Sequence, residues 1–595
     1  MKSRNENNSE CREFEFPENP VGMPHPLDSY KLVREWLEGK PNATSLVPPY
    51  DPTWASAIEQ RDSHPVIPLS AQEREELSAF NLGYGNVAGA ALVPALGEKD
   101  TLVVVTGQQP NLLVSPLFIL VKAVATVALA EEISRVTGRR VVPLFWVASD
   151  DHDFTELAQC YILGRSGTLR NLAVLVVRHG AFSEASPAYA WQLDPVAPHL
   201  AAALRGELPS GGARSATIDA VDNALASPAT FESVFCRLLA HYMEHSPIIF
   251  VAPRLRFLRV RQRLLVEQEI ELGEQTNKAV AEGAKLLSSH GYKPQIHRQA
   301  HVFNFFYMVD GVRCRLVQKG RRILVEHPGK KTVLTELPSA DLLAHAQRHW
   351  MNFSPNVVMR PIVQDAVFPT IAYVAGPAEF TYLAQIRRVY DLFGVCPSNP
   401  ILRPMVTLLS TGARVTLQRL GAWETFLHDG LGGVVEKIVE GDEKLGETLR
   451  RLRQHEDTLQ MELATLGNAL TGSFPDLAIA FEKTRHHVAS GLRKLRQRIL
   501  RQFRPSSWDL CRDLCSVFTE IAPMASPQER VLSPLSFGYE IEPQSLTLLL
   551  KEALVKWRPS PNPLILALGS GNRSNSLQSK AAGLKKTPLS SIEKE

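Results

Sequence analysis

The sequence predicts an α/β core followed by a long α-helical hairpin. Residues 101–106 form an apolar, β-branched run, a helical segment begins at Ser115-Pro116 and ends at Gly138, and residues 141–148 form a second apolar run. This order is typical of a β-α-β unit, in which a helix joins two parallel strands. Beyond residue 411, leucines recur at heptad spacing, which is typical of a coiled coil. A chain of 595 residues is also too long for a single core.

Polar side chains follow the predicted strands where each strand ends. Gly107, Gln108 and Gln109 leave the first strand, and Asp150 to Asp153 leave the second. A third strand, Thr370–Val374, is followed by the Gly376-Pro377 break and by Glu379, which we expect on a strand-to-helix loop. The carboxyl ends of parallel strands meet at one edge of a sheet, where open α/β proteins bind ligands. We therefore expect a single binding site there.

The second strand end carries the candidate catalytic residues Asp151, His152 and Asp153. Carboxylates beside an imidazole can orient an amine, accept its proton or hold Mg²⁺ against a nucleotide. Aspartate is also a preferred N-cap, so at least one of them is expected to cap the helix that begins at Phe154. Which aspartate caps and which reacts stays open. His152 is expected to face the cavity.

Other polar residues are expected to bind rather than react. Glutamine amides can orient a sugar, a carboxylate or an adenine edge, or merely close a loop. Guanidinium groups match carboxylates and phosphates, or pair internally with Asp365 or Glu379. Glu379 can instead act as an electrostatic helix cap. The predicted substrate-binding residues are Gln108, Gln109, Arg360, Gln364, Asp365, Glu379, Tyr382 and Arg403, and the predicted cofactor-binding residues are Gly107 and Gly376.

Several ordered segments resemble the bacillithiol-biosynthesis cysteine-adding enzymes, the BshC family. The strongest matches are Thr106–Gln109, Phe145–Phe154 and most of 353–386, and weaker ones are Gly291–His297 and Gln528–Arg530. Together they extend over most of the chain. The sequence departs from the family at Val-Ala-Pro-Arg, residues 251–254, where an acidic residue is expected after an apolar strand.

The resemblance implies a Rossmann-like, nucleotidyl-transferase-type core and a ligase activity. Its substrates would be L-cysteine and the amine of glucosaminyl-malate, joined in the last step of bacillithiol biosynthesis. Amide formation from a free carboxylate is uphill in water, so activation by ATP, with Mg²⁺ as a possible companion, is expected. Two alternatives stay open: a ligase for another amino acid or amino-sugar acceptor, and a non-catalytic coiled-coil protein with a degenerate nucleotide-binding fold.

Changes in composition along the chain indicate its organisation. Leu172–Val177 and Ile248–Val251 are expected as further strands, and residues 285–350 as a small antiparallel sheet. The predicted regions are an irregular arm (1–60), the α/β core (61–410) with insertions at about 179–230 and 285–350, the coiled-coil hairpin (411–510), a segment returning to the core (511–568) and a disordered tail (569–595).

Composition and charge narrow the partners. A net charge of +3 gives no strong field for nucleic acid, so small-molecule partners are expected. No secretory signal is expected, because the first 25 residues are polar and charged. The odd number of scattered cysteines predicts a reducing cytoplasm, and no metal site is predicted from them. The apolar stretch 111–130 is expected as a buried crossover helix rather than a membrane span. The hairpin is expected to pair its charges internally or across a homodimer rather than to bind nucleic acid.

Overall fold

The computed structural model describes residues 27–569, apart from short segments at 181–185, 298–300, 320–321, 328–333, 443–444, 474–476, 501–502, 504–506 and 556. The chain divides into two compact units. The first unit comprises Pro24–Thr407 and Pro527–Leu564, and the second contains Leu408–Ser526 with the chain from Ile565 onward.

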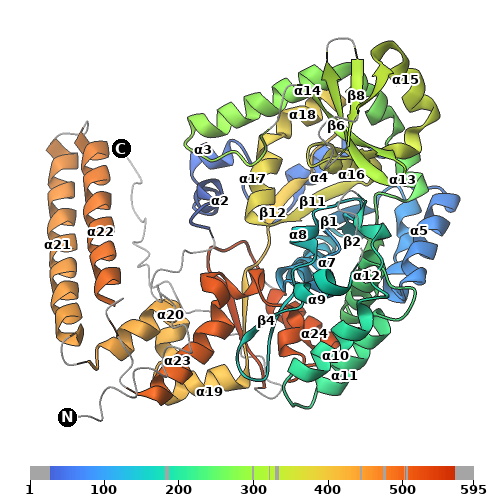
Figure 1. Cartoon of the computed structure of the whole chain (residues 1–595). Helices are drawn as coiled ribbons and strands as arrows, with labels where there is room; N and C mark the ends of the chain where they lie inside the picture. Colours follow the sequence, from blue (N-terminus) through green and yellow to red (C-terminus); the bar gives the residue numbers. More distant parts are fainter. Residues whose placement is uncertain are drawn as a thin grey trace. The chain divides into compact units, whose positions relative to one another are not determined.

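A five-stranded parallel sheet forms the centre of the first unit (Figure 1). Its strands are rich in β-branched and aromatic residues and are almost wholly buried, as expected for a sheet covered on both faces. The strand order is β12 (Asn399–Leu402), β11 (Thr370–Ala375), β1 (Leu102–Gln108), β2 (Val141–Val147) and β5 (Ile249–Val251). This sheet confirms the predicted α/β class.

Helix α7 (Phe118–Thr137) joins β1 to β2 and packs against both strands. It ends at Gly138, whose φ of 70° suits glycine, so the predicted β-α-β unit and its end are confirmed. The predicted start at Ser115 is wrong. A 3-10 turn, η2 (Leu112–Val114), with Leu113 in the left-handed region, precedes the helix, which begins only at Phe118. Among the described helices, none combines the length and apolar character needed to cross a bilayer.

The segment after β2 differs from its prediction. The run Leu172–Val177, expected as a strand, is instead part of helix α9 (Ala173–His179). Val176 is buried while Val174 and Val177 are exposed, so only one face of this helix packs against the protein. The other elements here are α8 (Phe154–Leu157), β3 (Tyr161–Leu163), β4 (Leu169–Asn171), η3 (Ala188–Ala190), α10 (Ala197–Glu207), α11 (Arg214–Ala224) and α12 (Phe231–Tyr242).

An antiparallel sheet follows the long helix α14 (Arg263–Ser289), as the alternating pattern predicted. Its order is β10 (Phe353–Pro355), β6 (Val302–Val309), β7 (Val312–Lys319), β8 (Arg322–Glu326) and β9 (Leu334–Pro338). The flanking elements are α13 (Arg256–Arg261), α15 (Ser339–Arg348), η4 (Trp350–Asn352), α16 (Met359–Val367), α17 (Pro377–Gln385) and α18 (Arg387–Phe393).

The N-terminal arm is more regular than predicted within its described part. Helices form there because apolar side chains such as Leu32, Val33 and Trp36 are buried against the fold. The elements of the arm are α2 (Lys31–Leu37), α3 (Pro41–Thr44) and α4 (Ala55–Asp62), which extends just past it. They are followed, before β1, by α5 (Ala71–Gly83), α6 (Val87–Ala90) and η1 (Val93–Gly97). The returning segment adds η7 (Gln528–Arg530), η8 (Pro534–Phe537) and α24 (Pro543–Leu554), which packs on α7. The predicted disordered tail lies outside the described residues, except for Gly569.

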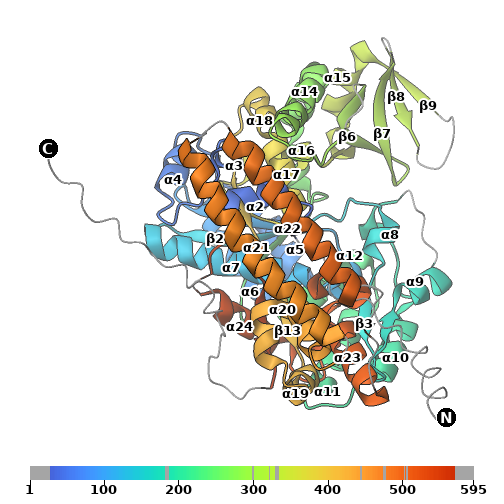
Figure 2. The same cartoon turned by 90° about the vertical axis from the view of Figure 1, so that its left-hand side faces the viewer.

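The second unit contains the predicted coiled-coil hairpin, in which α21 (Leu445–Ser473) and α22 (Ala478–Leu500) run side by side (Figures 1 and 2). Arg496 on α22 lies 3.6 Å from Glu456 on α21, so charges do pair within the hairpin. Leu449, Leu500 and Phe518 belong to the core of this unit. Its other elements are α19 (Thr411–Arg419), α20 (Trp423–Val439), α23 (Trp508–Ile521) and η6 (Pro523–Ala525). The strands β13 (Val406–Leu409) and β14 (Leu564–Ala567) begin in the first unit and end in the second.

Candidate active site

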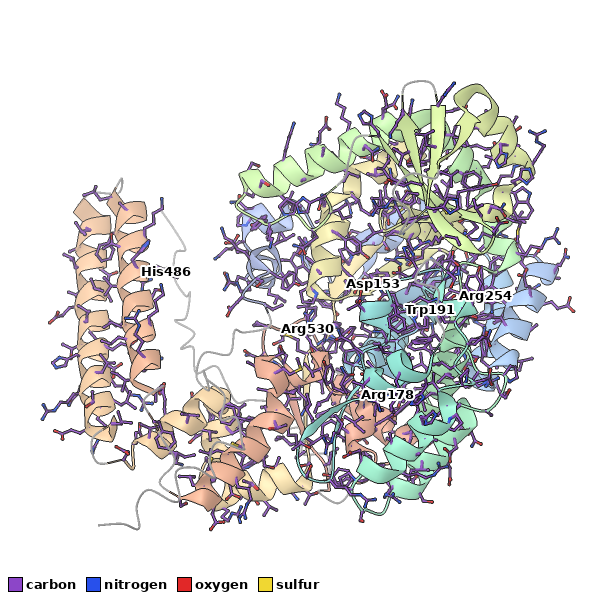
Figure 3. All side chains as sticks on the ribbon, in the orientation of Figure 1. Asp153, Arg178, Trp191, Arg254, His486 and Arg530 are labelled. Atoms are coloured by element: carbon purple, nitrogen blue, oxygen red, sulfur yellow. The ribbon has the colours of Figure 1, made fainter. Side chains whose placement is uncertain are left out.

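The carboxyl ends of β1, β2 and β11 open into a cavity of about 500 Å³ within the first unit. Nine of the thirteen lining residues that carry the chemistry were already named as strand-end or site residues in the sequence analysis, and the other four were not. Those thirteen are Gln108, Gln109, Lys122, Asp150, Asp151, His152, Glu156, Arg313, Arg360, Glu379, Tyr382, Arg403 and Arg530. Arg530, labelled in Figure 3, belongs to the returning segment. The predicted strand-end site therefore exists as a cavity.

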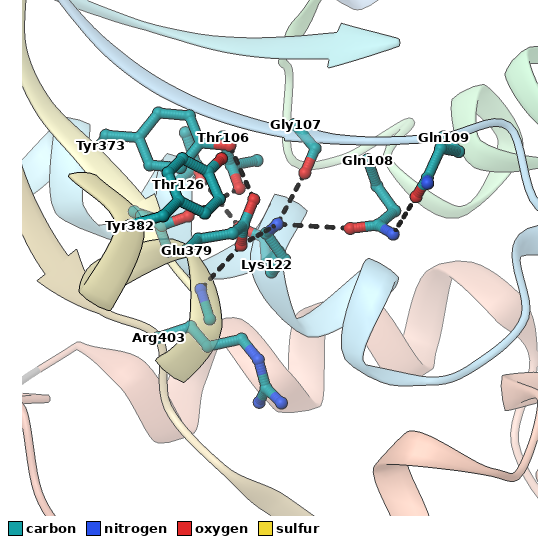
Figure 4. Close-up of polar contacts among 12 residues, drawn as sticks. Thr106, Gly107, Gln108, Gln109, Lys122, Thr126, Tyr373, Glu379, Tyr382 and Arg403 are labelled. Atoms are coloured by element: carbon teal, nitrogen blue, oxygen red, sulfur yellow. Dashed lines mark hydrogen bonds and ion pairs between the residues drawn. The ribbon is translucent and has the colours of Figure 1, made fainter. Parts of the chain in front are cut away.

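One corner of the cavity is built on Glu379, which lies in the first turn of α17 rather than on a loop. Its two carboxylate oxygens accept hydrogen bonds from Tyr373 at 2.9 Å and from the Gly376 backbone at 2.8 Å (Figure 4). The ammonium of Lys122 also lies 2.7 Å from this carboxylate and donates to the Gly107 carbonyl at 2.6 Å. Glu379 is thus a helix cap and half of an ion pair at once.

Burial and pairing act against each other at this ion pair. Burial lowers the pKa of Lys122, which is only 1% exposed, although Glu379 opposes that shift. For Glu379, burial alone would raise the pKa, but Lys122 and the Gly376 N–H hold it below its ordinary value. Both effects on Glu379 taken together favour the carboxylate form. The corner therefore presents a fixed negative charge that is already matched by a cation.

Arg360 presents a guanidinium to the cavity with neutral partners only. It donates to Tyr382 at 2.9 Å, to Gln364 at 3.2 Å and to Tyr373 at 3.4 Å. Within the described part of the chain it forms no ion pair with a carboxylate, so the alternative pairing with Asp365 or Glu379 does not occur. Although burial opposes it, the surrounding tyrosines and Glu379 raise the pKa of Arg360, which keeps it charged. It is an anion-binding group.

Gln364 and Asp365 lie behind Arg360 and do not line the cavity. Both side chains have no exposed surface. Asp365 accepts hydrogen bonds from Gln364, from Tyr390 and from the backbone of Ser398, all at 2.9–3.0 Å. Burial raises the pKa of Asp365. Their prediction as substrate-binding residues is corrected: they support Arg360 from inside the fold.

Arg403 reaches the cavity but is neutralised by a residue that the sequence pattern did not pair with it. Its guanidinium lies 2.7 Å from Glu529 and 5.2 Å from the ring centre of Phe118. Arg403 and Glu529 are 4% and 2% exposed. The structure therefore gives Arg403 a structural role in addition to its place in the cavity wall.

The opposite corner is built on the buried Asp150, whose carboxylate lies near the charges of Arg259 and Arg313. Arg259 pairs with one carboxylate oxygen, and Ser354 donates to the same oxygen at 2.7 Å. Burial alone would raise the pKa of Asp150, but Arg259 and Arg313 hold it below its ordinary value. Arg313 in turn stacks on Phe306, 4.0 Å from the ring centre. Asp150 is therefore an anion that orders the strand end.

His152 lies beside this pair and lines the cavity, as predicted. Its ring meets Phe306 edge to face at 6.0 Å, and Nδ1 lies 4.0 Å from Asp151, beyond hydrogen-bond range. Burial, followed by the charge of Arg313, lowers the pKa of His152. The imidazole is consequently neutral at pH 7 and able to accept a proton.

Asp153 turns out to be the aspartate that caps the following helix. Its side chain accepts the backbone N–H of Glu156 at 3.1 Å, at the start of α8. It does not line the cavity. Of the predicted catalytic residues, the structure thus brings Asp151 and His152 to the cavity and uses Asp153 as an N-cap.

The two predicted glycines lie in the cavity wall, and each has a structural reason. A Cβ on Gly107 would come within 3.0 Å of Trp146 on the neighbouring strand β2, so only glycine fits without a shift. Gly376 is the N-cap of α17, and its N–H is taken up by Glu379. The Gly107 carbonyl is likewise occupied by Lys122, so both backbones shape the site from within.

The departure at Val251–Arg254 has a local explanation. Arg254, labelled in Figure 3, forms an ion pair with Glu232 on α12 and donates to Tyr84 at 3.1 Å. Glu232 is 1% exposed on its side chain. This chain therefore carries a cation after β5 and supplies the matching carboxylate from a different helix.

Sequence reasoning missed Lys122, Glu156, Arg313 and Arg530 as cavity residues. Only Lys122 gave a local signal, because a lysine in an otherwise apolar buried helix must find a partner. Arg313 comes from the antiparallel sheet and Arg530 from the returning segment, so no local pattern places them here. Among the described residues, no group of three or more histidine, cysteine or acidic side chains is arranged to hold a metal.

Comparison with known proteins agrees with this arrangement. The family model described as "Bacillithiol biosynthesis BshC, N-terminal Rossmann-like domain" matches residues 26–404, and "Bacillithiol biosynthesis BshC, C-terminal coiled-coil domain" matches residues 424–556. Proteins named "Putative cysteine ligase BshC" are similar at 28% identity: one from Salinibacter ruber over 76% of this chain and 81% of its own length, and one from Heliobacterium modesticaldum over 82% and 89%. These matches confirm the resemblance found in the motifs.

Proposed function

This chain belongs to the BshC family of bacillithiol biosynthesis, and on that premise we propose that it is a ligase that joins L-cysteine to the amine of glucosaminyl-malate. The observation that carries the proposal is a pairing of opposite chemistry in one cavity. Arg360 offers a guanidinium with no ion-pair partner among the described residues, and His152 offers a neutral imidazole. An amide ligase needs both an anion site and a proton acceptor.

The anion side of the cavity suits carboxylate and phosphate groups. Arg360 can bind a carboxylate through two parallel N–H groups, with Tyr382 beside it. Arg530 extends this wall, together with Arg403, which is paired with Glu529. A volume of about 500 Å³ lies in the range of small-molecule sites. Cysteine and glucosaminyl-malate both carry carboxylates, so this wall is where those carboxylates are proposed to bind.

The acid side of the cavity suits the amine. His152 would take the proton that the amine nitrogen loses as it attacks the activated cysteine carbonyl. Asp151 would stabilise the resulting imidazolium from 4.0 Å away. Gln108 would orient the acceptor sugar through its amide, and Gln109 would do so through Asp151 and Glu156, to which it donates. In this scheme one C–N bond forms, one C–O bond to the activating group breaks, and the proton leaves on His152.

Activation of the carboxylate is proposed to come from ATP. The nucleotide would turn a carboxylate oxygen into a phosphate leaving group, giving amide with either AMP and pyrophosphate or ADP and phosphate. Arg360, Arg403 and Arg530 are the side chains whose charge fits the phosphates. Mg²⁺ would enter with the nucleotide, because the described residues offer no separate cluster for it.

The test is mass spectrometry of thiols after incubation of the purified protein with isotope-labelled cysteine, glucosaminyl-malate and ATP. The expected product carries the label in a new amide, and its amount matches the nucleotide consumed. Omitting ATP should abolish it, and assay of AMP against ADP identifies the activation route. Serine in place of cysteine, and glucosamine in place of glucosaminyl-malate, test the alternative specificities. Absence of amide product with every pair would favour a non-catalytic role.

A further inference from the structure

A continuous chain of hydrogen-bonded side chains connects the two corners of the cavity. It starts at Glu379, passes to Lys122 at 2.7 Å and on to Gln108 at 3.4 Å. Gln108 then donates to Gln109 at 2.6 Å. The amide of Gln109 finally donates to Asp151 and to Glu156, at 3.2 Å each. Figure 4 shows the part from Glu379 to Gln109.

The chemistry of Lys122 fixes the direction of this chain. An ammonium can only donate, so the oxygen of the Gln108 amide must face it. The nitrogen of Gln108 is then left to donate to the oxygen of Gln109. The nitrogen of Gln109 is left in turn to donate to the two carboxylates. With a donor-only group at one end and acceptor-only groups at the other, both amides have a single consistent orientation.

The far end of the chain needs such a donor. Asp151 and Glu156 lie on the same side of the cavity and share the Gln109 amide, although their like charges repel. Burial raises the pKa of Glu156, and so do the charges of Asp153 and Asp151. The Gln109 amide acts against that shift by bonding the charged form. A reversed or displaced Gln109 would present its oxygen to two carboxylates.

We propose that Lys122 is a positioning residue of the ligation reaction, which acts through Gln108 and Gln109 to hold Asp151 and Glu156 in place where the amine substrate binds. Lys122 itself is only 1% exposed and sits behind Gly107, so it acts through the chain rather than on the amine. Its effect on the amine substrate rests on the proposed function. The order of the side chains themselves does not.

The kinetic test compares Lys122→Met, Gln109→Leu and the double variant in the full-length protein. Each single change should raise the KM for glucosaminyl-malate at least about tenfold, with a smaller change in kcat. Because both changes break the same chain, the KM of the double variant should be no higher than that of the more impaired single variant. That would be a strong coupling for two residues that do not touch. Fold-changes that multiply in the double variant, or an unchanged KM in Lys122→Met, would overturn the proposal.

A matched control lies one helical turn away. Thr126 is buried on the same helix, and among the described residues its hydroxyl donates only to the backbone carbonyl of Lys122, so Thr126→Val should keep the wild-type KM. Lys122→Met leaves Glu379 without its cation and can fail to fold for that reason. The variant Lys122→Met with Glu379→Gln removes both charges together. It should fold and still show the raised KM for the amine substrate.

Crystal structures separate this proposal from the proposed function. In Lys122→Met, or in its double variant with Glu379→Gln, the Gln109 amide should rotate or leave Asp151 and Glu156, with separations beyond 3.5 Å. In Thr126→Val both contacts should persist. If the wild-type protein makes no amide, the proposed function fails while the crystal structures still decide the chain. Retention of both Gln109 contacts without Lys122 would refute the positioning role.

Discussion

The guanidinium of Arg403 lies 2.7 Å from a carboxylate oxygen of Glu529, and the two side chains are 4% and 2% exposed. Glu529 also accepts the backbone N–H of Val406 at 2.8 Å. The pair thus ties the returning segment of the chain to the strand-end region of the first unit. Removing one partner of such a pair leaves a buried charge, at a cost of about 3–5 kcal/mol.

We therefore predict that Arg403→Met lowers the stability of the first unit by about 3 kcal/mol, visible as a reduced midpoint of thermal and urea unfolding. The double variant with Glu529→Gln should recover part of the loss, since no uncompensated charge remains. Wild-type unfolding of Arg403→Met together with a large loss of ligation would instead make Arg403 mainly a substrate-binding residue.

Arg360 should behave in the opposite way. Its partners Tyr382, Tyr373 and Gln364 are neutral, so removing its charge leaves no carboxylate unpaired among the described residues. We predict that Arg360→Met lowers kcat/KM roughly 10- to 100-fold, because hydrogen bonds to charged groups contribute about 1.5–3 kcal/mol. The unfolding midpoint should stay within a few degrees of wild type.

Arg360→Lys is the control, because it keeps the charge and loses the planar fork. If two parallel hydrogen bonds to an anion matter, this variant should be nearly as impaired as Arg360→Met. Full activity of Arg360→Lys would show that charge alone suffices, and full activity of both variants would remove Arg360 from the site.

We predict that protonation of His152 lowers the ligation rate at acid pH, which gives the pH profile an acid limb. Burial and Arg313 lower its pKa below the ordinary 6.5. The neutral form is the proposed base, so the rate should fall at acid pH with an apparent pKa below 6.5. His152→Ala should lower kcat about 100-fold or more and remove this limb.

The lowered pKa of His152 also determines how the folding stability changes with pH. The folded state binds this proton more weakly than the unfolded chain, so the stability from neutral His152 is complete above pH 6.5 and is lost as the pH falls towards the folded pKa. Asp153→Ala serves as the comparison, since it should cost about 1 kcal/mol through loss of the α8 cap. It should keep the acid limb but move it to lower pH, because the charge of Asp153 raises the pKa of His152. Full turnover with an early melting transition in His152→Ala would make His152 structural.

How much of this could be read from the sequence depends on how local each signal is. Continuous apolar runs located β1 and β2, glycine marked the end of α7, and the heptad pattern located the hairpin, because these signals reflect local burial. The strand-end rule then placed Gln108, His152 and Arg360 in one cavity. These steps need only neighbouring residues and the direction of parallel strands.

The partners of charged groups could not be read in the same way. Lys122 pairs with Glu379, and Arg403 with Glu529, across more than a hundred positions, so no spacing rule relates them. The strand expected at Leu172–Val177 is a helix because β propensity is overridden where no neighbouring strand is available. Gln364 and Asp365 were misplaced because a polar residue near a motif can serve the interior as well as the cavity.

The hairpin predicts the oligomeric state. Several large apolar side chains on α21, α22 and their connection remain 46–66% exposed, namely Met461, Leu466, Leu477 and Leu495. Apolar side chains exposed on a coiled coil are normally covered by a partner helix. We predict a homodimer, measured by light scattering at micromolar concentration, and a monomer when residues 430–503 are deleted.

A point variant gives the sharper version of this prediction. Met461→Glu with Leu466→Glu places charges at two of these exposed apolar positions without touching the buried Leu449. Helical circular dichroism should stay near wild type, while the mass in solution should fall to that of one chain. Glu462→Lys is the control: it changes a charge on the same helix but adds none at an apolar position. It should leave the dimer intact. A monomeric wild-type protein would contradict the predicted dimer. A dimer that survives the double change would show that Met461 and Leu466 do not form its interface.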